Sequence, residues 1–416
     1  MKVVGIIAEY NPFHNGHQHH ILEAKKQTGA DYVIVVMSGN FVQRGAPSIV
    51  NKYSKTKAAL ESGADLVFEL PVIYSTSSAQ YFSLGAISLL DQLGLVDYIC
   101  FGSESGNIES LTSIASYLHN NSDEYNEVIK KLMKDGITFP EARQIAIKKH
   151  NPTINDNVIS SPNNILGIEY IKAILDLNSN IVPVAISRVE STYHEPNLNL
   201  EESIYSISSA TSIRKTIESR SNIDIIKKHV PNASFNILKE EYNKTFPIHQ
   251  NDFSKLLKYK LLQESKESLT KYADVSYDLA NRIQNLSFVS HSFSSYAQEV
   301  KSKQWTLTRI NRSLIHILLN LKSKNLELYN NNNYTQYGRL LGFNKNSTKL
   351  INNIKNNSKM PIITKLSESY NILSDIELQM LNEDIFAANL YNLIVYEKFD
   401  SLINNEFKQG LEIHLP

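Results

Sequence analysis

Cysteine, tryptophan and long hydrophobic runs are scarce in this sequence of 416 residues. The single cysteine, Cys100, cannot form a disulfide within the chain, and it cannot build a zinc site alone. No run of about 18 apolar residues is present, which argues against a membrane-spanning helix. The first residues are apolar but lack a small-residue cleavage site, so we interpret them as a strand and not as a signal peptide. We therefore expect a cytoplasmic protein.

The sequence also lacks an excess of charge of either sign, since 42 Lys and Arg balance 42 Asp and Glu. This balance excludes a uniformly basic coat for nucleic acid and an acidic tail protein. The apolar share of 42% excludes a disordered or collagen-like chain. At this length the chain is large enough for two or three domains with a sizeable core.

Strand-like and helix-like segments alternate in the first half of the chain. Apolar runs without polar alternation are typical of strands that are buried on both faces. Strands joined by helices indicate a parallel α/β sheet with right-handed crossovers. The predicted strands are residues 3–8, 31–37, 65–70, 97–102 and 181–186. The predicted helices of this half are residues 17–28, 52–62, 79–93, 108–150 and 163–177.

The pattern changes after about residue 220, where strand-like runs become rare. We place a domain boundary near residue 222, which gives an α/β domain over residues 1–222 and a mostly helical domain over residues 223–416. Helical apolar spacing in this second half predicts helices over residues 253–264, 270–286, 306–321 and 378–398.

One part of the helical half is strongly basic. Residues 300–367 contain twelve Lys or Arg and a single acid, Glu327. For the stretch as a whole, such an excess favours a surface that binds a polyanion, whereas for any single lysine a solvated face is favoured. Aromatic residues among these cations either stack on bases of a nucleic acid or belong to the core: Trp305, Tyr334, Tyr337 and Phe343.

The segment with the most chemical information is IAEYNPFHNGHQHH, residues 7–20, which follows the first strand and opens the first helix. Ligands bind at the carboxyl ends of the strands in a parallel sheet. A helix N-terminus there favours phosphate, and Gly16 lets a ligand approach the backbone. His14 and His17 can both donate to one phosphoryl group. Polar surface and a metal cluster of the four histidines are the alternatives, but no carboxylate or cysteine at suitable spacing completes a metal set.

A second element, SISSATSIRK at residues 206–215, follows the fifth strand and opens another helical pattern. Ser208 or Ser209 is placed to cap that helix. With Thr211 and Arg214, these serines can surround the outer phosphates of a nucleotide with hydroxyl groups and one cation. Taken alone, this segment is an ordinary capped helix. The two elements together, in this order and about 190 residues apart, favour a nucleotide site.

The patterns H-x-G-H after the first strand and I-S-S-x-x-x-I-R late in the sheet resemble the HIGH-type nucleotidylyltransferase superfamily. Further segments narrow the resemblance to the bacterial tRNA(Met) cytidine acetate ligase family, namely GIIAEYNPFHNGH, MSGNFVQRG, FELP, FGSE, PNNILGIEYI and ISSATSIR. The resemblance is dense over residues 1–220 and looser beyond. It implies a Rossmann-like parallel sheet in an ATP-binding nucleotidylyltransferase domain, followed by a mostly helical domain that binds tRNA.

The resemblance also implies an ATP-dependent ligase that works in two steps. ATP would activate acetate as acetyl-adenylate with release of pyrophosphate. The acetyl group would then pass to N4 of the wobble cytidine of elongator tRNA(Met), forming N4-acetylcytidine. The implied partners are ATP, acetate and tRNA(Met), with Mg²⁺ bridging the phosphates, and neither DNA nor a membrane takes part. Because the attacking carboxylate is already an anion, the first step needs alignment and charge neutralisation and no general base.

Roles for single residues follow from the same resemblance. His14, His17 and Arg214 would be catalytic, and Ser209 would hold the outer phosphates together with Arg214. The segment 7–20 would form most of the ATP site, with Ile7, Ala8, Glu9, Tyr10, Asn11, Pro12, Phe13, His14, Asn15, Gly16, His17, Gln18, His19 and His20.

The remaining implied nucleotide contacts each have a structural alternative. Gly102 in FGSE also suits a turn. Asn163 in PNNILG also suits a helix N-cap, and Asn164 takes its place if the register is off by one. Arg188 and Val189 in AISRVE would flank the adenosine, although an arginine here also suits a surface ion pair. Residues 43–44 in MSGNFVQRG either face substrate or RNA or form only a polar loop.

Two other functions fit parts of the sequence. A small-molecule adenylyltransferase, which makes a dinucleotide from ATP, would share both motifs. The long helical half with its basic stretch favours the RNA ligase over that alternative. An RNA-binding protein with a vestigial nucleotide fold is a non-enzymatic alternative, and the intact His14, Gly16, His17 and Arg214 argue against it.

Overall fold

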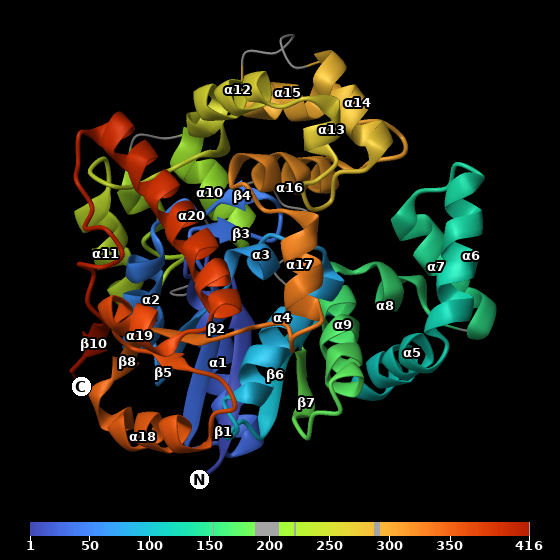
Figure 1. Cartoon of the computed structure of the whole chain (residues 1–416). Coiled ribbons are helices and arrows are strands. Elements are labelled where there is room, and N and C mark those ends of the chain that lie inside the picture. Colours follow the sequence, from blue (N-terminus) through green and yellow to red (C-terminus); the bar gives the residue numbers. More distant parts are fainter. Residues whose placement is uncertain (153, 188–207, 220–221, 287–291, 416) are drawn as a thin grey trace.

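The computed structural model describes the chain except for residues 153, 188–207, 220–221, 287–291 and 416 (Figure 1). Its centre is an eight-stranded sheet in the order β10-β8-β5-β2-β1-β6-β7, with β9 paired to β8, and β3 and β4 form a separate hairpin. The strands are β1 (Val3–Ala8), β2 (Tyr32–Ser38), β3 (Phe41–Val42), β4 (Ala46–Pro47), β5 (Leu66–Leu70), β6 (Tyr98–Ser103), β7 (Val182–Ser187), β8 (Gly338–Asn344), β9 (Ile362–Ile363) and β10 (Glu412–His414).

Helices surround this sheet, and α12 to α16 lie above the carboxyl ends of its parallel strands, whereas α5 to α7 project to one side (Figure 1). The α-helices are α1 (Asn15–Thr28), α2 (Lys52–Glu61), α3 (Val72–Ser75), α4 (Ala79–Gln92), α5 (Ile108–Asn120), α6 (Ser122–Lys134), α7 (Phe139–His150), α8 (Asp156–Ser160), α9 (Pro162–Asp176), α10 (Ala210–Ser219), α11 (Asn232–Glu241), α12 (Ser254–Gln263), α13 (Lys266–Leu269), α14 (Tyr277–Leu286), α15 (Phe293–Val300), α16 (Leu307–Leu318), α17 (Ser323–Asn330), α18 (Thr348–Asn357), α19 (Ser369–Ile372) and α20 (Asp375–Phe399). Short 3₁₀ turns are η1 (Ile223–Ile226), η2 (Gln250–Phe253), η3 (Lys345–Ser347) and η4 (Leu366–Glu368).

The five predicted strands are β1, β2, β5, β6 and β7, and each prediction is correct to within one residue. They run parallel to their neighbours within this group. Side chains of β2 alternate between two cores. Val33 and Val35 pack in the core that contains α1 and α2, whereas Ile34 and Val36 pack in the core that contains α4 and α9. Because both faces are covered, the strands have continuous apolar sequences. The predicted α/β fold class is confirmed.

The order of the parallel strands reverses between β1 and β6. In chain order the strands lie third, second, first, fourth and fifth across the sheet. A crevice forms at such a reversal because the connections leave the two central strands in opposite directions. The fold therefore has this crevice, where ligands commonly bind, at the carboxyl ends of β1 and β6.

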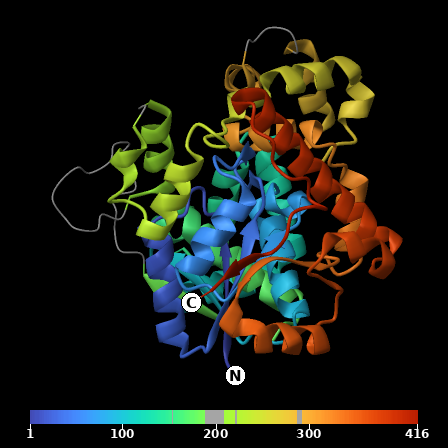
Figure 2. The same ribbon diagram turned by 90° about the vertical axis from the view of Figure 1, so that its left-hand side faces the viewer.

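The second half is mostly helical, as predicted, but it also adds three strands to the central sheet. Strand β8 pairs antiparallel with β5, and β10 pairs parallel with β8. Figure 2 shows the C-terminal segment, in red, running beside the blue elements of the N-terminal half. The boundary near residue 222 stays a prediction, but the central sheet contains strands from both sides of it.

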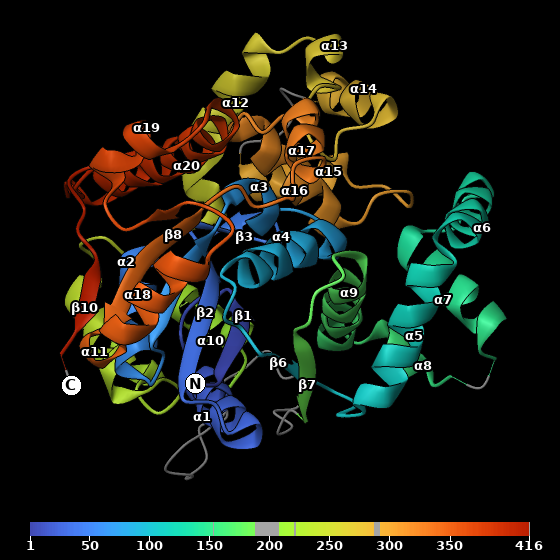
Figure 3. The same cartoon turned by 60° about the horizontal axis from the view of Figure 1, so that its bottom comes forward.

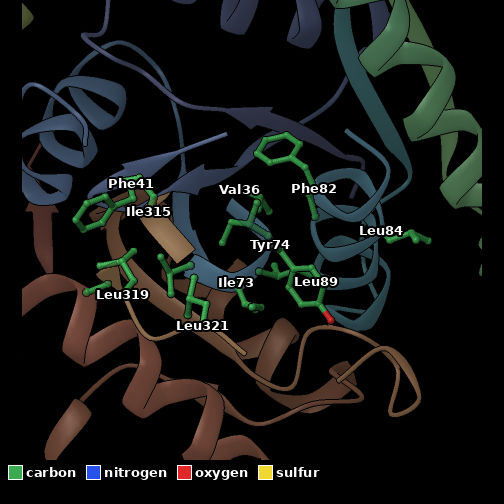
Figure 4. Close-up of a cluster of buried hydrophobic side chains, with 14 of the residues drawn as sticks. Val36, Phe41, Ile73, Tyr74, Phe82, Leu84, Leu89, Ile315, Leu319 and Leu321 are labelled. Carbon is green, nitrogen blue, oxygen red and sulfur yellow. The ribbon is translucent and has the colours of Figure 1, made fainter. Parts of the chain in front are cut away.

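A hydrophobic core also joins the two halves. Ile315 and Leu319, at the end of α16, lie in one buried cluster with Phe41 of β3 and Ile73 of α3 (Figure 4). His316 of the same helix is fully buried, and its Nε2 lies 3.0 Å from the carbonyl oxygen of Thr76. This packing fixes α16 against the carboxyl ends of the parallel strands.

Among the described residues, the chain contains no helix whose length and apolar character would let it cross a membrane.

Candidate active site

A cavity of about 690 Å³ lies at the carboxyl ends of β1, β6 and β7, where the strand order reverses. Ten of the predicted nucleotide contacts line it, namely Ile7, Ala8, Glu9, His14, Gly16, His17, His19, His20, Gly102 and Asn163. The cavity lining does not include Tyr10, Asn11, Pro12, Phe13, Asn15, Gln18, Ser209 and Arg214. Arg188 and Val189 lie outside the described residues. Contact with ATP stays a prediction for every one of these positions.

The loop between β1 and α1 is held by hydrogen bonds from the segment around β3 and β4. Glu9 Oε1 accepts the N–H of Gln43 at 2.9 Å, and Asn11 Oδ1 accepts the N–H of Ile49 at 2.8 Å. Between them, Tyr10 has a φ of 48°, which lies in the left-handed region. This conformation costs a non-glycine residue on the order of 1–3 kcal/mol, and it persists only where the surroundings fix it. These hydrogen bonds therefore fix the backbone of the loop, and its buried residues hold in place the residues that face the cavity.

His14 and His17 lie where this loop enters α1. The backbone N–H of His14 donates to Nδ1 of His17 at 3.2 Å, and the two rings stack with centroids 3.6 Å apart. Because Nδ1 of His17 accepts this bond, the neutral ring carries its proton on Nε2. Nε2 is therefore the atom of His17 that can donate to a ligand. Both rings line the cavity, so the local geometry suits two adjacent donors for one phosphoryl group.

The second predicted element lies directly against this loop. Arg214 Nη1 donates to the carbonyl oxygen of Asn11 at 2.7 Å, and Nη2 donates to Thr211 Oγ1 at 3.1 Å. Burial lowers the pKa of Arg214 and the nearby Arg44 acts in the same direction, while Glu9 opposes them. An arginine remains charged at neutral pH in any such setting. A fixed positive charge therefore lies beside the β1–α1 loop.

The two serines of this element have different roles. Ser209 caps α10 by accepting the N–H of Ser212 at 3.2 Å. Ser208 Oγ lies 2.8 Å from Nδ1 of His229, whose carbonyl oxygen accepts the N–H of Asn15 at 3.1 Å. The structure thus brings together the two motifs that are about 190 residues apart in the sequence.

The paired asparagines at the start of α9 also differ. Asn164 is 1% exposed, and its Oδ1 accepts hydrogen bonds from Ser103 Oγ–H at 2.7 Å and from the N–H of Glu104 at 3.0 Å. Glu104 in turn accepts the backbone N–H groups of Asn163 and Asn164 at 3.2 and 2.9 Å. Asn164 therefore fixes the loop after β6, while Asn163 lines the cavity.

Sequence reasoning missed one side of the cavity, which comes from α16. Thr308 and Arg312 of this helix line the cavity together with Gln43 and Arg44. Arg312 Nε donates to Asp274 Oδ2 at 2.9 Å. Gly45 has a φ of 71°, and a Cβ atom there would lie 2.3 Å from the backbone nitrogen of Arg312, so only glycine permits this close approach. The turn between β3 and β4 therefore rests on α16, and residues 43–44 face the cavity.

The basic stretch of residues 300–367 does not form one surface. Arg312 lines the cavity, whereas Arg339 of β8 is buried in an ion-pair network with Lys52, Glu69 and Glu406. The lysines of η3 and α18 lie far from the cavity. Because β8 is antiparallel to β5, it ends near the amino ends of the parallel strands, and the cavity lies at their carboxyl ends. Asn353 of α18 contacts Met1, and α18 lies at the end of the sheet where the chain begins (Figures 1 and 3).

Two of the candidate stacking residues belong to the core. Trp305 is 7% exposed and Tyr337 is fully buried, so neither ring is available to a base. Tyr334 and Phe343 are half-buried and pack against the same core. Tryptophan and tyrosine carry large apolar areas, and here their burial stabilises the fold. Of the two alternatives for these aromatic residues, the place in the core is therefore correct for Trp305 and Tyr337.

Known proteins resemble this chain over nearly its whole length. The model of the HIGH Nucleotidyl Transferase family matches residues 1–406. A protein of Acetivibrio thermocellus named tRNA(Met) cytidine acetate ligase is 39% identical over 99% of this chain and 100% of its own length. A protein of the same name from Caldicellulosiruptor saccharolyticus is 42% identical over 100% of this chain and 99% of its own. This chain belongs to the tRNA(Met) cytidine acetate ligase family.

Solved structures of this ligase family have the same architecture. The crystal structure of Thermotoga maritima TmcAL bound with α-thio ATP superposes with a TM-score of 0.90, 30% identity and full coverage of both chains. The apo structure of the same protein gives a TM-score of 0.92 at the same identity and coverage. The predicted family, and its Rossmann-like sheet with a mostly helical second half, are confirmed.

Proposed function

We propose that this chain uses ATP to activate acetate as acetyl-adenylate and transfers the acetyl group to N4 of the wobble cytidine of elongator tRNA(Met). The observation that carries the proposal is the junction of the two motifs at the strand reversal, where Arg214 donates to Asn11 and His229 accepts from Asn15. Membership of the ligase family and the TmcAL structure that was solved with an ATP analogue support it. Because ATP and tRNA are its substrates, we place the enzyme in the cytoplasm.

In the first step, a carboxylate oxygen of acetate attacks the α-phosphorus of ATP. The new P–O bond forms while the bond to the β-phosphate oxygen breaks, and pyrophosphate leaves with the electron pair. Negative charge grows on the α-phosphoryl oxygens, and we assign Nε2 of His17 and the ring of His14 to stabilise it. Arg214 adds a fixed positive charge beside the same loop, which we assign to the outer phosphates together with Ser209.

Magnesium enters this scheme with the ATP phosphates, as a part of the substrate. Mg²⁺ prefers oxygen ligands, keeps several waters and is commonly held by one or two carboxylates plus substrate phosphates. The described residues contain no group of three or more His, Cys, Asp or Glu that could hold a metal ion. Glu9 lines the cavity and offers one carboxylate, which fits an ion that is bound mainly by phosphate.

In the second step, the N4 amine of cytidine attacks the carbonyl carbon of acetyl-adenylate. The bond to the AMP phosphate oxygen breaks, AMP leaves as an anion and the amine loses one proton. Water hydrolyses the reactive anhydride, so the bound RNA should exclude water by covering one side of the cavity. We assign that side to α16, since Arg312 is the member of the basic stretch that lines the cavity.

The function is tested with the purified protein, ATP, Mg²⁺, radiolabelled acetate and total bacterial tRNA, followed by digestion to nucleosides. We expect ATP-dependent label in N4-acetylcytidine. Pyrophosphate release without label in the RNA would support the adenylation step, but it would refute either tRNA as the acceptor or acetate as the activated carboxylate. The absence of both, with active ATP and tRNA confirmed, would refute the ligase and favour adenylylation of a small metabolite.

The placement of RNA at α16 gives a first prediction. In Arg312→Gln, transfer of acetyl to tRNA should fall about tenfold or more, because a hydrogen bond to a charged group contributes about 1.5–3 kcal/mol. Acetate-dependent exchange of pyrophosphate into ATP should stay within about twofold, since Arg312 lies on the acceptor side of this scheme. Both reactions are measured on the same preparation.

Lys349→Glu on α18 provides the control for this prediction. This exposed lysine belongs to the same basic stretch, but it lies toward the amino ends of the parallel strands, away from the cavity. Acetyl transfer should be unchanged in that variant. If Lys349→Glu weakens transfer as much as Arg312→Gln does, the RNA does not approach from α16.

A further inference from the structure

Lys55 of α2 is a buried cation directly behind the β1–α1 loop. It is 1% exposed, and its Nζ donates to three backbone carbonyl oxygens, those of Glu9 at 2.9 Å and of Ser38 and Gly39 at 2.8 Å each. An ammonium group has three N–H donors and no acceptor, so three carbonyl oxygens match it completely. A neutral amine has only two N–H donors and would leave one buried carbonyl without a partner.

One of these three carbonyl groups belongs to a residue that lines the cavity, and the other two lie at the carboxyl end of the neighbouring strand. Glu9 directly follows β1 and lines the cavity, while Ser38 ends the neighbouring strand β2 and Gly39 follows it. The ammonium group therefore joins the carboxyl ends of two adjacent parallel strands. The residue after Glu9 is Tyr10, whose left-handed conformation needs an external constraint.

Charged groups around Lys55 come from three elements. Glu9 belongs to the β1–α1 loop, Glu69 to β5 and Lys52 to α2 itself. Burial lowers the pKa of Lys55 to about 7, with Glu9 and Glu69 opposing that shift and Lys52 adding to it. A lysine in this setting changes its charge within the range of pH in which the enzyme can be assayed.

The comparison with Lys52 shows what is particular to Lys55. Both lysines are 1% exposed and lie on α2. Lys52 Nζ pairs with the carboxylates of Glu69 and Glu406 at 2.8 and 2.7 Å. Neither carboxylate lines the cavity, so Lys52 stabilises the sheet. Lys55 instead contacts the main chain of the loop that leads to His14 and His17.

We propose that Lys55 is a positioning residue for ATP, whose ammonium group fixes the Glu9–Tyr10 turn and thereby the part of the cavity wall that Glu9 contributes. This inference rests on the proposed function. Lys55 touches neither substrate, and it acts through the backbone of Glu9. Loss of its positive charge should weaken ATP binding more than it slows the adenylation of bound ATP.

The test uses the full chain with Lys55→Met and Lys55→Arg, and it measures acetate-dependent pyrophosphate exchange between about pH 6 and 10. The methionine variant should raise KM for ATP at least tenfold with a smaller change in kcat, because it removes all three charged hydrogen bonds to the backbone. In the wild type, KM for ATP should rise as Lys55 loses its proton. This rise should move to higher pH in Lys55→Arg, since a guanidinium remains charged.

Each outcome decides the proposal. A folded Lys55→Met with the ATP KM and pH profile of the wild type would overturn it, with folding checked by urea denaturation. If Lys55→Met does not fold, the proposal is overturned when KM for ATP in Lys55→Arg rises at the same pH as in the wild type. If neither variant folds, a wild-type KM for ATP that is constant across this pH range would do so. A wild type without any acetate-dependent exchange would instead refute the proposed function itself.

Discussion

His14→Ala and His17→Ala should each slow acetate-dependent release of pyrophosphate by about 10²-fold or more, because a preorganised donor to transition-state charge contributes about 3 kcal/mol. The two rings stack at a centroid distance of 3.6 Å and line the same cavity, so they act on one group. The His17 variant also loses the acceptor of the His14 N–H, which helps to start α1. Its loss should therefore be at least as large as that of His14→Ala.

This result is measured as single-turnover formation of acetyl-adenylate with ATP and acetate at saturation. His119→Ala is the matched control, because His119 pairs with Asp176 at 2.7 Å outside the cavity lining. That variant should keep the rate of the wild type. Rates like those of the wild type in both His14→Ala and His17→Ala would refute the assignment of the two rings to the α-phosphate.

Arg339→Met should have the largest effect on stability. Arg339 contacts Glu69 at 3.2 Å and Glu406 at 2.6 Å, and Lys52 contacts the same two carboxylates. All four side chains are at most 6% exposed. Removing one member of a buried ion pair leaves an uncompensated charge and costs about 3–5 kcal/mol. We expect a loss of that size in the free energy of unfolding from urea denaturation.

The control for Arg339→Met is Lys255→Met, which breaks the exposed pair with Glu397. Exposed pairs contribute about 0–1 kcal/mol, so the unfolding midpoint should hardly move. Equal losses in the two variants would contradict the role of the buried network.

Acid provides a further check on the buried network. Although burial acts to raise it, Lys52 and Arg339 lower the pKa of Glu406 to about 2. The stabilisation by this carboxylate is complete above its ordinary pKa and is lost as the pH falls toward 2. A wild type that keeps its full stability at pH 2 would contradict this account.

The sequence predicts the parallel sheet well because both of its faces are covered. Burial on two sides leaves continuous apolar runs in β1, β2, β5 and β6, and the less buried edge strand β7 has such a run as well. All five strands are predicted to within one residue. Strands β8 and β10 have no such mark. The apolar run of β8 is interrupted by Arg339 and Gly342, and β10 has only three residues. Their pairing with β5 and with each other depends on contacts far apart in the sequence.

The candidate site is predictable to the extent that it is local. H-x-G-H and the capped helix at Ser209 are sequence patterns with a fixed geometry, and the structure brings them together. The part from α16 depends on how that helix packs on the β3–β4 turn, which no local pattern reveals. The basic stretch does not predict a single surface, since charges that are close in sequence lie at opposite ends of the strands.

The shared sheet has a consequence for how this protein is made. During synthesis the β1–α1 loop and its histidines leave the ribosome long before Arg339 and Glu406. Until then Lys52 and Glu69 lack two of the charges that compensate them, and β5 lacks its neighbour β8. The nascent N-terminal half therefore carries an open sheet edge at β5, where Lys52 and Glu69, among the described residues, have only each other as ionic partners until β8 and Glu406 are added.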